Sequence, residues 1–194
     1  MAENKEKKKF GLIIFIVVIM IGTTFGSVFF GFSPVSEKVK YKEYTFTFIP
    51  NQNIWISKIN GRNAAFSLLP SEVENVMIDG TFSQRLKDRI EIDVTSDANS
   101  TFNESIALAQ HQMGLTLSAY QVYVRKGFTT NNTFNFPIIK CEHSTVNVPV
   151  VYFRNGNETK ISVESNCIIA EASSDTEFIR VKDRLLYGIL GVIK

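Results

Sequence analysis

The longest apolar stretch of the chain, residues 10–32, carries no charge and directly follows Lys5, Lys7, Lys8 and Lys9. A bilayer core about 30 Å thick needs roughly 20 apolar residues in a helix. The pattern predicts a transmembrane signal anchor at 10–32, preceded by a cytoplasmic basic tail at 1–9. The competing interpretation is a cleaved signal peptide with its cleavage site among the small residues 23–27.

Beyond this segment the pattern changes to one of short strands. We expect a polar stalk at 33–42 and one domain at 43–194, because about 160 residues suit a single core. Alternating aromatic and threonine positions predict a strand at 43–49. The apolar runs 54–59 and 64–69 flank Asn60-Gly61, a dipeptide typical of hairpin turns. A short helical turn is expected at 71–76, after Pro70.

Two segments have helical periodicity. The first is predicted at about 104–117, opened by a capping box of Thr101 and Glu104. The second is predicted at about 175–191, opened by Ser174 and Glu177. Its apolar stripe passes through positions 178, 181, 185, 189 and 192, which leaves Arg180, Asp183 and Arg184 outside the stripe.

The remaining strands complete the predicted fold. Strands near 90–94 and 122–128 flank the first helix, an order typical of a parallel crossover. A second hairpin is predicted from 148–153 and 159–163, followed by a strand at 167–172. Pro149 places the first of these strands at a sheet edge or at a strand start. The fold class is therefore α+β: a transmembrane helix followed by one mixed sheet domain with two main helices.

The charge distribution indicates which partners are excluded and on which side of the membrane the domain lies. The chain carries a net charge of +2, and residues 1–32 alone account for it with four lysines against two glutamates. The neutral remainder lacks the basic stripe that nucleic acid requires, so nucleic acid is excluded as a partner. The lysine excess before the anchor predicts a cytoplasmic N-terminus and an extracytoplasmic domain in a single-pass cell-membrane protein, with the lipid bilayer as a partner.

Two further features favour this orientation. Four N-x-[ST] motifs follow the anchor, and their asparagines are glycosylation candidates: Asn99, Asn103, Asn131 and Asn157. Cys141 and Cys167 make an even cysteine count, which predicts one disulfide in a domain outside the cytoplasm.

The candidate chemistry is sparse. Cys141 and His143 form a C-x-H pair that, with His111 and Cys167, suggests a zinc site or an activated thiol. The disulfide is the favoured interpretation, because a zinc site also needs closely paired ligands. We therefore predict no metal and no cofactor.

Two other patterns have structural interpretations. Alternating oxygens at 97–103 are typical of a calcium loop, but Phe102 and Leu108 replace its glycine and its final glutamate, which favours a helix start. Glu91 and Asp93 are interpreted as the solvent face of a strand. Aromatic residues on alternating strands are interpreted as core rather than as an exposed platform for sugars or a partner: Phe46, Phe48, Trp55 and Phe66.

Short motifs resemble a known group of proteins. Residues 68–74 (LLPSEVE), the pair Cys141 and Cys167 with the following Ile-Ile, and residues 183–191 (DRLLYGILG) look like small archaeal single-pass membrane-anchored proteins of uncharacterised function. The resemblance implies a location and an architecture, with no reaction to carry over.

No catalytic motif is present in the sequence: there is no G-x-S-x-G, no H-E-x-x-H, no P-loop and no G-x-G-x-x-G. The predicted function is therefore a membrane-anchored extracytoplasmic binding or structural module, a subunit of a cell-surface assembly with protein partners, rather than an enzyme. The alternatives are a cell-surface hydrolase or thiol enzyme using His111, His143 or Cys141, and a pilin-like filament subunit.

Overall fold

The computed structural model describes residues 36–78 and 81–193. Residues Glu37–Lys194 form one compact unit. The predicted tail, the anchor at 10–32 and the first residues of the stalk lie outside the described residues. Within the described ranges, no helix has the length and apolar character that crossing a membrane requires.

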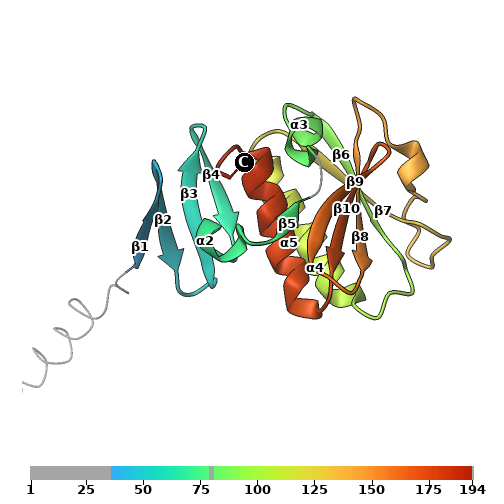
Figure 1. The fold of residues 1–194 in the computed structure, drawn as a ribbon, viewed down its shortest axis with the longest axis horizontal. Coiled ribbons are helices and arrows are strands. Elements are labelled where there is room, and N and C mark those ends of the chain that lie inside the picture. Colours follow the sequence, from blue (N-terminus) through green and yellow to red (C-terminus); the bar gives the residue numbers. More distant parts are fainter. Residues whose placement is uncertain (1–35, 79–80, 194) are drawn as a thin grey trace, which may run out of the picture. The chain divides into compact units, whose positions relative to one another are not determined.

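The first sheet is an antiparallel meander (Figure 1). Its strands are β1 (Lys38–Tyr41), β2 (Tyr44–Ile49), β3 (Ile54–Ile59) and β4 (Arg62–Phe66). The predicted strand at 43–49 and the first hairpin are confirmed. Asn60 and Gly61 adopt φ angles of 49° and 80°, the positive values that a tight hairpin turn needs. The segment predicted as a stalk contributes β1 to this sheet.

The second sheet has six strands in the order β5-β9-β10-β8-β6-β7. These are β5 (Met77–Ile78), β6 (Glu91–Ser96), β7 (Tyr123–Phe128), β8 (Val150–Asn155), β9 (Lys160–Glu164) and β10 (Cys167–Ala172). Strands β7, β6, β8 and β10 run parallel to one another, whereas β9 is antiparallel to β10. The predicted strand-helix-strand unit at 89–127 is a parallel crossover, as expected.

Two sequence predictions about the sheets are wrong. The domain has two sheets instead of one mixed sheet. The predicted second hairpin does not form, because β10 lies between β8 and β9, and β9 pairs with β10 instead. Every residue of β10 is buried, which suits a strand with neighbours on both sides.

The helices are α2 (Pro70–Val73), α3 (Phe82–Leu86), α4 (Asn103–Ser118) and α5 (Asp175–Ile189), with a 3₁₀ turn η1 (Cys141–His143). Helices α4 and α5 occupy the two predicted helical ranges to within two residues. Neither predicted capping box forms, because the side chains at both helix starts make no capping hydrogen bond. The Thr101 hydroxyl instead accepts a hydrogen bond from Asn155 Nδ2 at 3.0 Å.

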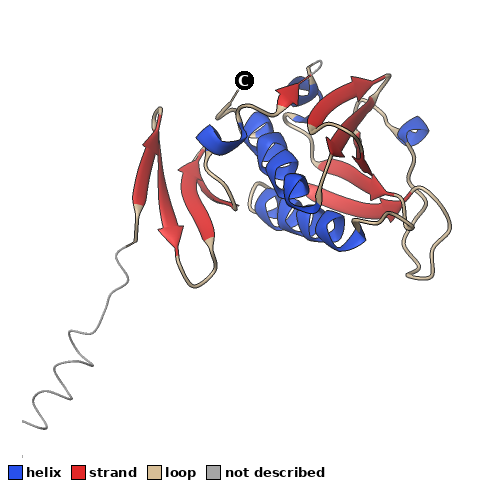
Figure 2. Ribbon diagram, turned by 60° about the horizontal axis from the view of Figure 1, so that its bottom comes forward, coloured by secondary structure: helices blue, strands red, loops and turns tan. Residues whose placement is uncertain are grey.

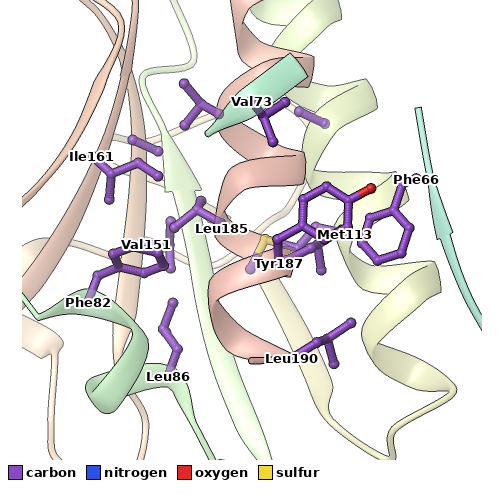
Figure 3. Close-up of a cluster of buried hydrophobic side chains, with 14 of the residues drawn as sticks. Phe66, Val73, Phe82, Leu86, Met113, Val151, Ile161, Leu185, Tyr187 and Leu190 are labelled. Atoms are coloured by element: carbon purple, nitrogen blue, oxygen red, sulfur yellow. The ribbon is translucent and has the colours of Figure 1, made fainter. Parts of the chain in front are cut away.

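Helices α4 and α5 lie between the two sheets (Figures 1 and 2). Tyr187 of α5 stacks on Phe66 of β4 with ring centroids 4.1 Å apart, and the Tyr187 hydroxyl donates to the Leu68 carbonyl at 2.7 Å. Figure 3 shows Phe82 and Leu86 of α3 on the other side of α5, near Val151 of the second sheet. One apolar core therefore joins both sheets to the helices.

This placement buries residues that the sequence placed outside the apolar stripe of α5. Lys182, Asp183 and Arg184 are 1%, 0% and 2% exposed. A helix covered on both sides has no broad solvent face, so these charges pack against the segment that follows β4 and against α3. Asp183 and Arg184 are therefore buried although they lie outside the predicted apolar stripe.

The far face of the second sheet is covered by the segment 129–149. Ile139 packs there with Val150, Cys167 and Ile169, and Thr95 Oγ1 donates to the Ile139 carbonyl at 2.8 Å. Asp93 is 1% exposed and its carboxylate accepts two hydrogen bonds from Arg125 of β7, so its predicted solvent position was wrong. Parallel strands are buried on both faces, and β6 follows that rule.

Candidate functional site

The carboxyl ends of β6 and β8 form a topological switch point. From β6 the chain passes through α4 to β7 on one side, while β8 pairs with the other edge of β6. In open parallel sheets, ligands bind in the crevice where successive connections leave in opposite directions. Ser96, the last residue of β6, lies at this edge of the sheet.

A cavity of about 340 Å³ opens at this edge. The ends of β6 and β7, the start of α4 and the loop 129–137 contribute its walls. Its lining combines three aromatic with four polar side chains: Phe128, Phe134, Phe136, Ser96, Asn103, Glu104 and Gln110. An apolar hollow with a few polar groups has the composition of a small-molecule site.

The aromatic wall is built around Phe128. Its ring centroid lies 5.9 Å from those of both Phe134 and Phe136, and the contact with Phe136 is edge-to-face at 74°. Phe134 is 67% exposed and Phe136 is 45% exposed. Grouped large apolar side chains at a surface are typical of binding sites.

Asn132 holds the loop in this conformation. Its Nδ2 donates to the Phe136 carbonyl at 2.9 Å, and its Oδ1 accepts the backbone N–H of Phe134 at 3.0 Å and of Phe136 at 3.2 Å. One amide side chain can replace the backbone pairing that a sheet would supply. These hydrogen bonds fix the loop conformation and thereby position the exposed rings of Phe134 and Phe136.

Gly127 allows the end of this loop to approach β7. The Phe128 N–H donates to the Pro137 carbonyl at 3.0 Å, and the Ile139 N–H donates to the Phe128 carbonyl at 2.8 Å. A Cβ at position 127 would lie 2.6 Å from both the Pro137 carbonyl oxygen and the Ile139 side chain. Only glycine at position 127 leaves room for residues 137–139 to lie against β7.

Two of the lining residues each have one buried polar atom that makes no hydrogen bond among the described residues. Gln110 is 5% exposed, and its Nε2 has no partner. Asn103 Nδ2 donates to the Ala98 carbonyl at 2.7 Å, which leaves Asn103 Oδ1 unpaired. Buried polar groups in native proteins are nearly always paired, so these two atoms need an explanation.

A smaller polar hollow of about 230 Å³ lies beside the cavity, lined in part by Asp97, Tyr152 and Arg154. Asp97 Oδ1 accepts the Asn99 N–H at 2.9 Å, which closes the turn before α4. Burial, followed by the nearby Asp97 carboxylate, raises the pKa of Tyr152. The segment 97–103 thus leads into the start of α4, as the sequence indicated. In the described part of the chain, no three metal-ligating side chains cluster together.

The predicted disulfide is confirmed. Cys141 and Cys167 are bonded, with their Cα atoms 5.1 Å apart. His143 Nδ1 accepts the Lys140 N–H at 3.1 Å within η1, whereas His111 lies on α4, 3.5 Å from Lys126 Nζ. The alternative grouping of a thiol with an imidazole does not assemble, because both sulfurs are in the disulfide and α4 and η1 cover opposite faces of the sheet.

The other candidate residues are spread over the surface. Asn99, Asn131 and Asn157 are exposed, while Asn103 is half-buried in the cavity wall. Phe46 and Phe66 are buried in the core, as interpreted from the sequence. Phe48 and Trp55 are half-buried and contact each other, with centroids 5.0 Å apart.

Sequence reasoning missed the cavity residues Gln110, Phe128, Phe134 and Phe136. A signal was available, because three phenylalanines stand within the otherwise polar segment 128–136, FTTNNTFNF. Loops seldom carry so many aromatic residues without a structural or binding role. Gln110 lies on the buried side of α4, where the sequence alone does not separate it from a core position.

No model of a known protein family matches the chain, and no curated protein or solved structure shows significant similarity to it. The resemblance to archaeal membrane-anchored proteins stays a prediction.

Proposed function

We propose that this protein is an extracytoplasmic binding module held at a membrane by its apolar segment 10–32. Its binding site is the cavity between the ends of β6 and β7 and the start of α4. The observation that carries the proposal is the aromatic wall of this cavity, where Phe134 and Phe136 are 67% and 45% exposed beside Phe128. A bound ligand would cover these exposed apolar rings.

The location rests on the sequence. The uncharged stretch at 10–32, the lysines before it and the neutral charge of the remainder support a tethered domain outside the cytoplasm. The disulfide supports the same side of the membrane, because disulfides persist in oxidising compartments. We also propose that the module acts within a larger cell-surface assembly.

The alternatives have less support. A thiol enzyme needs a free sulfur on Cys141, which is bonded to Cys167. A hydrolase using His111 or His143 lacks a nucleophile hydrogen-bonded to either ring among the described residues. The pilin-like alternative depends on residues 1–32, which lie outside the described residues.

Binding is tested on the full chain in lipid nanodiscs. Ligand-observed NMR with neutral, acidic and basic aromatic fragments is expected to detect binding to the native chain, and the Phe134→Ser/Phe136→Ser variant is expected to lose it. Tyr123→Ser is the matched control, because Tyr123 is 64% exposed at the opposite end of β7. Absence of binding in every class, or equal loss in the control, would overturn the proposal.

Location and assembly need separate measurements. In intact cells, an impermeant amine-reactive label is expected to reach the lysines after residue 36 and not those before residue 10. Crosslinking in the same membranes is expected to recover a complex. Recovery of monomer alone would contradict the assembly, and labelling of the N-terminal lysines would contradict the orientation.

A further inference from the structure

We infer that the cavity binds a quaternary ammonium group, with its methyl groups against Phe128, Phe134 and Phe136 and its charge near the Glu104 carboxylate. This inference rests on the proposed function and specifies the ligand class of the same site. The rings and the carboxylate are separate observations. Phe134, Phe136 and Glu104 are all exposed, so a ligand in the cavity can reach them.

The aromatic wall indicates a compact cation. The ring of Phe134 is tilted by 34° from that of Phe128 and the ring of Phe136 by 74°, and both centroids lie 5.9 Å from that of Phe128. The face of an aromatic ring carries negative potential and attracts a cation within about 6 Å of its centroid. A group with methyls in several directions can contact rings of different inclination at once, whereas a flat ring stacks on one of them.

Glu104 supplies the negative charge of the site. It lies in the first turn of α4, and its exposed carboxylate has no hydrogen bond or ion pair with any described residue. It is also the one ionisable side chain in the described lining of the cavity. A cation beside the rings would therefore meet an opposite charge and no like charge from this lining, whereas an anion would meet only a like charge.

Other cations suit this cavity less well. A calcium ion needs six to eight oxygen ligands, and the described lining offers one carboxylate. A primary ammonium is strongly hydrated and carries three donors that the phenylalanine rings cannot pair. A quaternary ammonium has no N–H donor, so it can lie against the rings without losing a hydrogen bond. A volume of about 340 Å³ is at the lower end of the range for ligand pockets, which suits such a small group.

The test compares choline with 3,3-dimethylbutan-1-ol, which has carbon in place of the choline nitrogen and so keeps the shape without the charge. Saturation-transfer NMR titrations are run on the full chain in phosphatidylglycerol nanodiscs, which contain no choline, with protein-free nanodiscs as the blank. Choline is expected to bind about tenfold more tightly than the neutral alcohol. Equal affinities would overturn the inference.

The Glu104→Gln variant isolates the charge. It is expected to weaken choline binding about fivefold and to leave the alcohol unaffected. A carboxylate in the first turn of a helix also stabilises that helix, but a purely structural role would change both probes alike or neither. Asp88→Asn is the matched control, because it removes the same charge from an exposed position before β6, at the other end of that strand from Ser96. It is expected to retain choline affinity.

The Phe134→Leu variant isolates the aromatic face, because leucine keeps an apolar side chain and removes the ring. It is expected to weaken choline binding about threefold with little change for the alcohol. Tyr123→Leu is the matched control, since Tyr123 is 64% exposed at the opposite end of β7. It is expected to bind both probes as the native chain does.

A third probe, glycerophosphocholine, distinguishes two sources of the same group. Binding as tight as that of choline indicates a lipid head group, and weaker binding indicates a free solute, because the added phosphodiester would face Glu104.

The outcomes separate this inference from the proposed function. Unchanged choline affinity in Glu104→Gln or Phe134→Leu, or equal loss in their controls, overturns the ammonium ligand while leaving a binding module. Failure of choline to bind while aromatic fragments do bind has the same meaning. If those fragments also fail, the proposed function falls with it.

Discussion

Lys182 and Asp183 are consecutive residues of α5, yet Lys182 Nζ lies 2.6 Å from Asp183 Oδ1 with both side chains buried. The second carboxylate oxygen of Asp183 accepts the N–H groups of Ser67 and Leu68, each at 2.9 Å. Burial raises the pKa of Asp183, and Lys182 and the two amides oppose that rise. One carboxylate thus ties the segment after β4 to the central helix.

We predict that Asp183→Asn lowers the free energy of unfolding by about 3–5 kcal/mol, because it leaves the Lys182 ammonium buried without its counter-charge. Urea unfolding of the full chain in detergent measures the change. The control is Lys182→Met/Asp183→Asn, which removes the ammonium as well and is expected to be less destabilised. A double variant as unstable as the single one would contradict the ion-pair explanation.

The disulfide is expected to contribute about 3.5 kcal/mol, because it closes a loop with a sequence separation of 26 residues. Cys141→Ser/Cys167→Ser should lower the free energy of unfolding by that amount. Alkylation of the unreduced, denatured chain is expected to modify neither cysteine. Two freely alkylated thiols in protein taken from cells would show that the bond does not form there.

Gly127→Ala is expected to displace the segment 137–139 and with it the loop that carries Phe134 and Phe136. The added Cβ has no room beside Pro137 and Ile139, so we expect a destabilisation of about 1–3 kcal/mol together with loss of fragment binding. Gly114→Ala is the matched control. Its Cβ would meet only Val124 at 3.7 Å, and in helix α4 the change should stabilise by up to about 1 kcal/mol.

Stability is expected to fall in alkaline solution. Burial raises the pKa of Tyr120 from 10.0 to about 12, and its hydroxyl donates to the Ile59 carbonyl at 3.0 Å. Because the folded pKa is above the unfolded one, this stabilisation is fully present below pH 10 and is lost as pH rises towards about 12. Urea unfolding across this range is expected to show a shallower decline for Tyr120→Phe. An unchanged slope would contradict the assignment.

Glycosylation is expected to distinguish between the four sequons. In a secreting host that glycosylates N-x-[ST] sites, modification is expected at Asn99, Asn131 and Asn157, which are exposed. Asn103 is expected to stay unmodified, because its Nδ2 is bonded to the Ala98 carbonyl at the start of α4. Glycopeptide mass spectrometry reads all four sites, and a glycan on Asn103 would show that the cavity wall is open during folding.

Local patterns in the sequence predicted local structure well. The Asn60-Gly61 turn, the helices α4 and α5 and the crossover from β6 to β7 depend on neighbouring residues, and they form where expected. Pairing between distant strands was not predictable in this way. The alternation in β8 and β9 suits a hairpin as well as it suits two strands separated by β10.

The site escaped sequence prediction for the same reason. The cavity exists because β6 and β7 run parallel and end at one edge, where α4 begins, so residues 96, 110 and 128 meet only in the folded chain. Likewise, the sequence alone does not show that Lys182, Asp183 and Arg184 of α5 are buried, because their burial depends on the first sheet packing against the helix. The disulfide was predictable because the chain has only two cysteines to pair.

The central place of β10 has a consequence for biosynthesis. Of the described strands, β10 is synthesised last, yet it is the strand that pairs with both β8 and β9. Until residue 172 emerges, these two strands present open edges, which are prone to pairing with other chains. Folding of this sheet is therefore a late event that needs the chain through residue 172, and a product truncated before that point would be a target for chaperones and proteases.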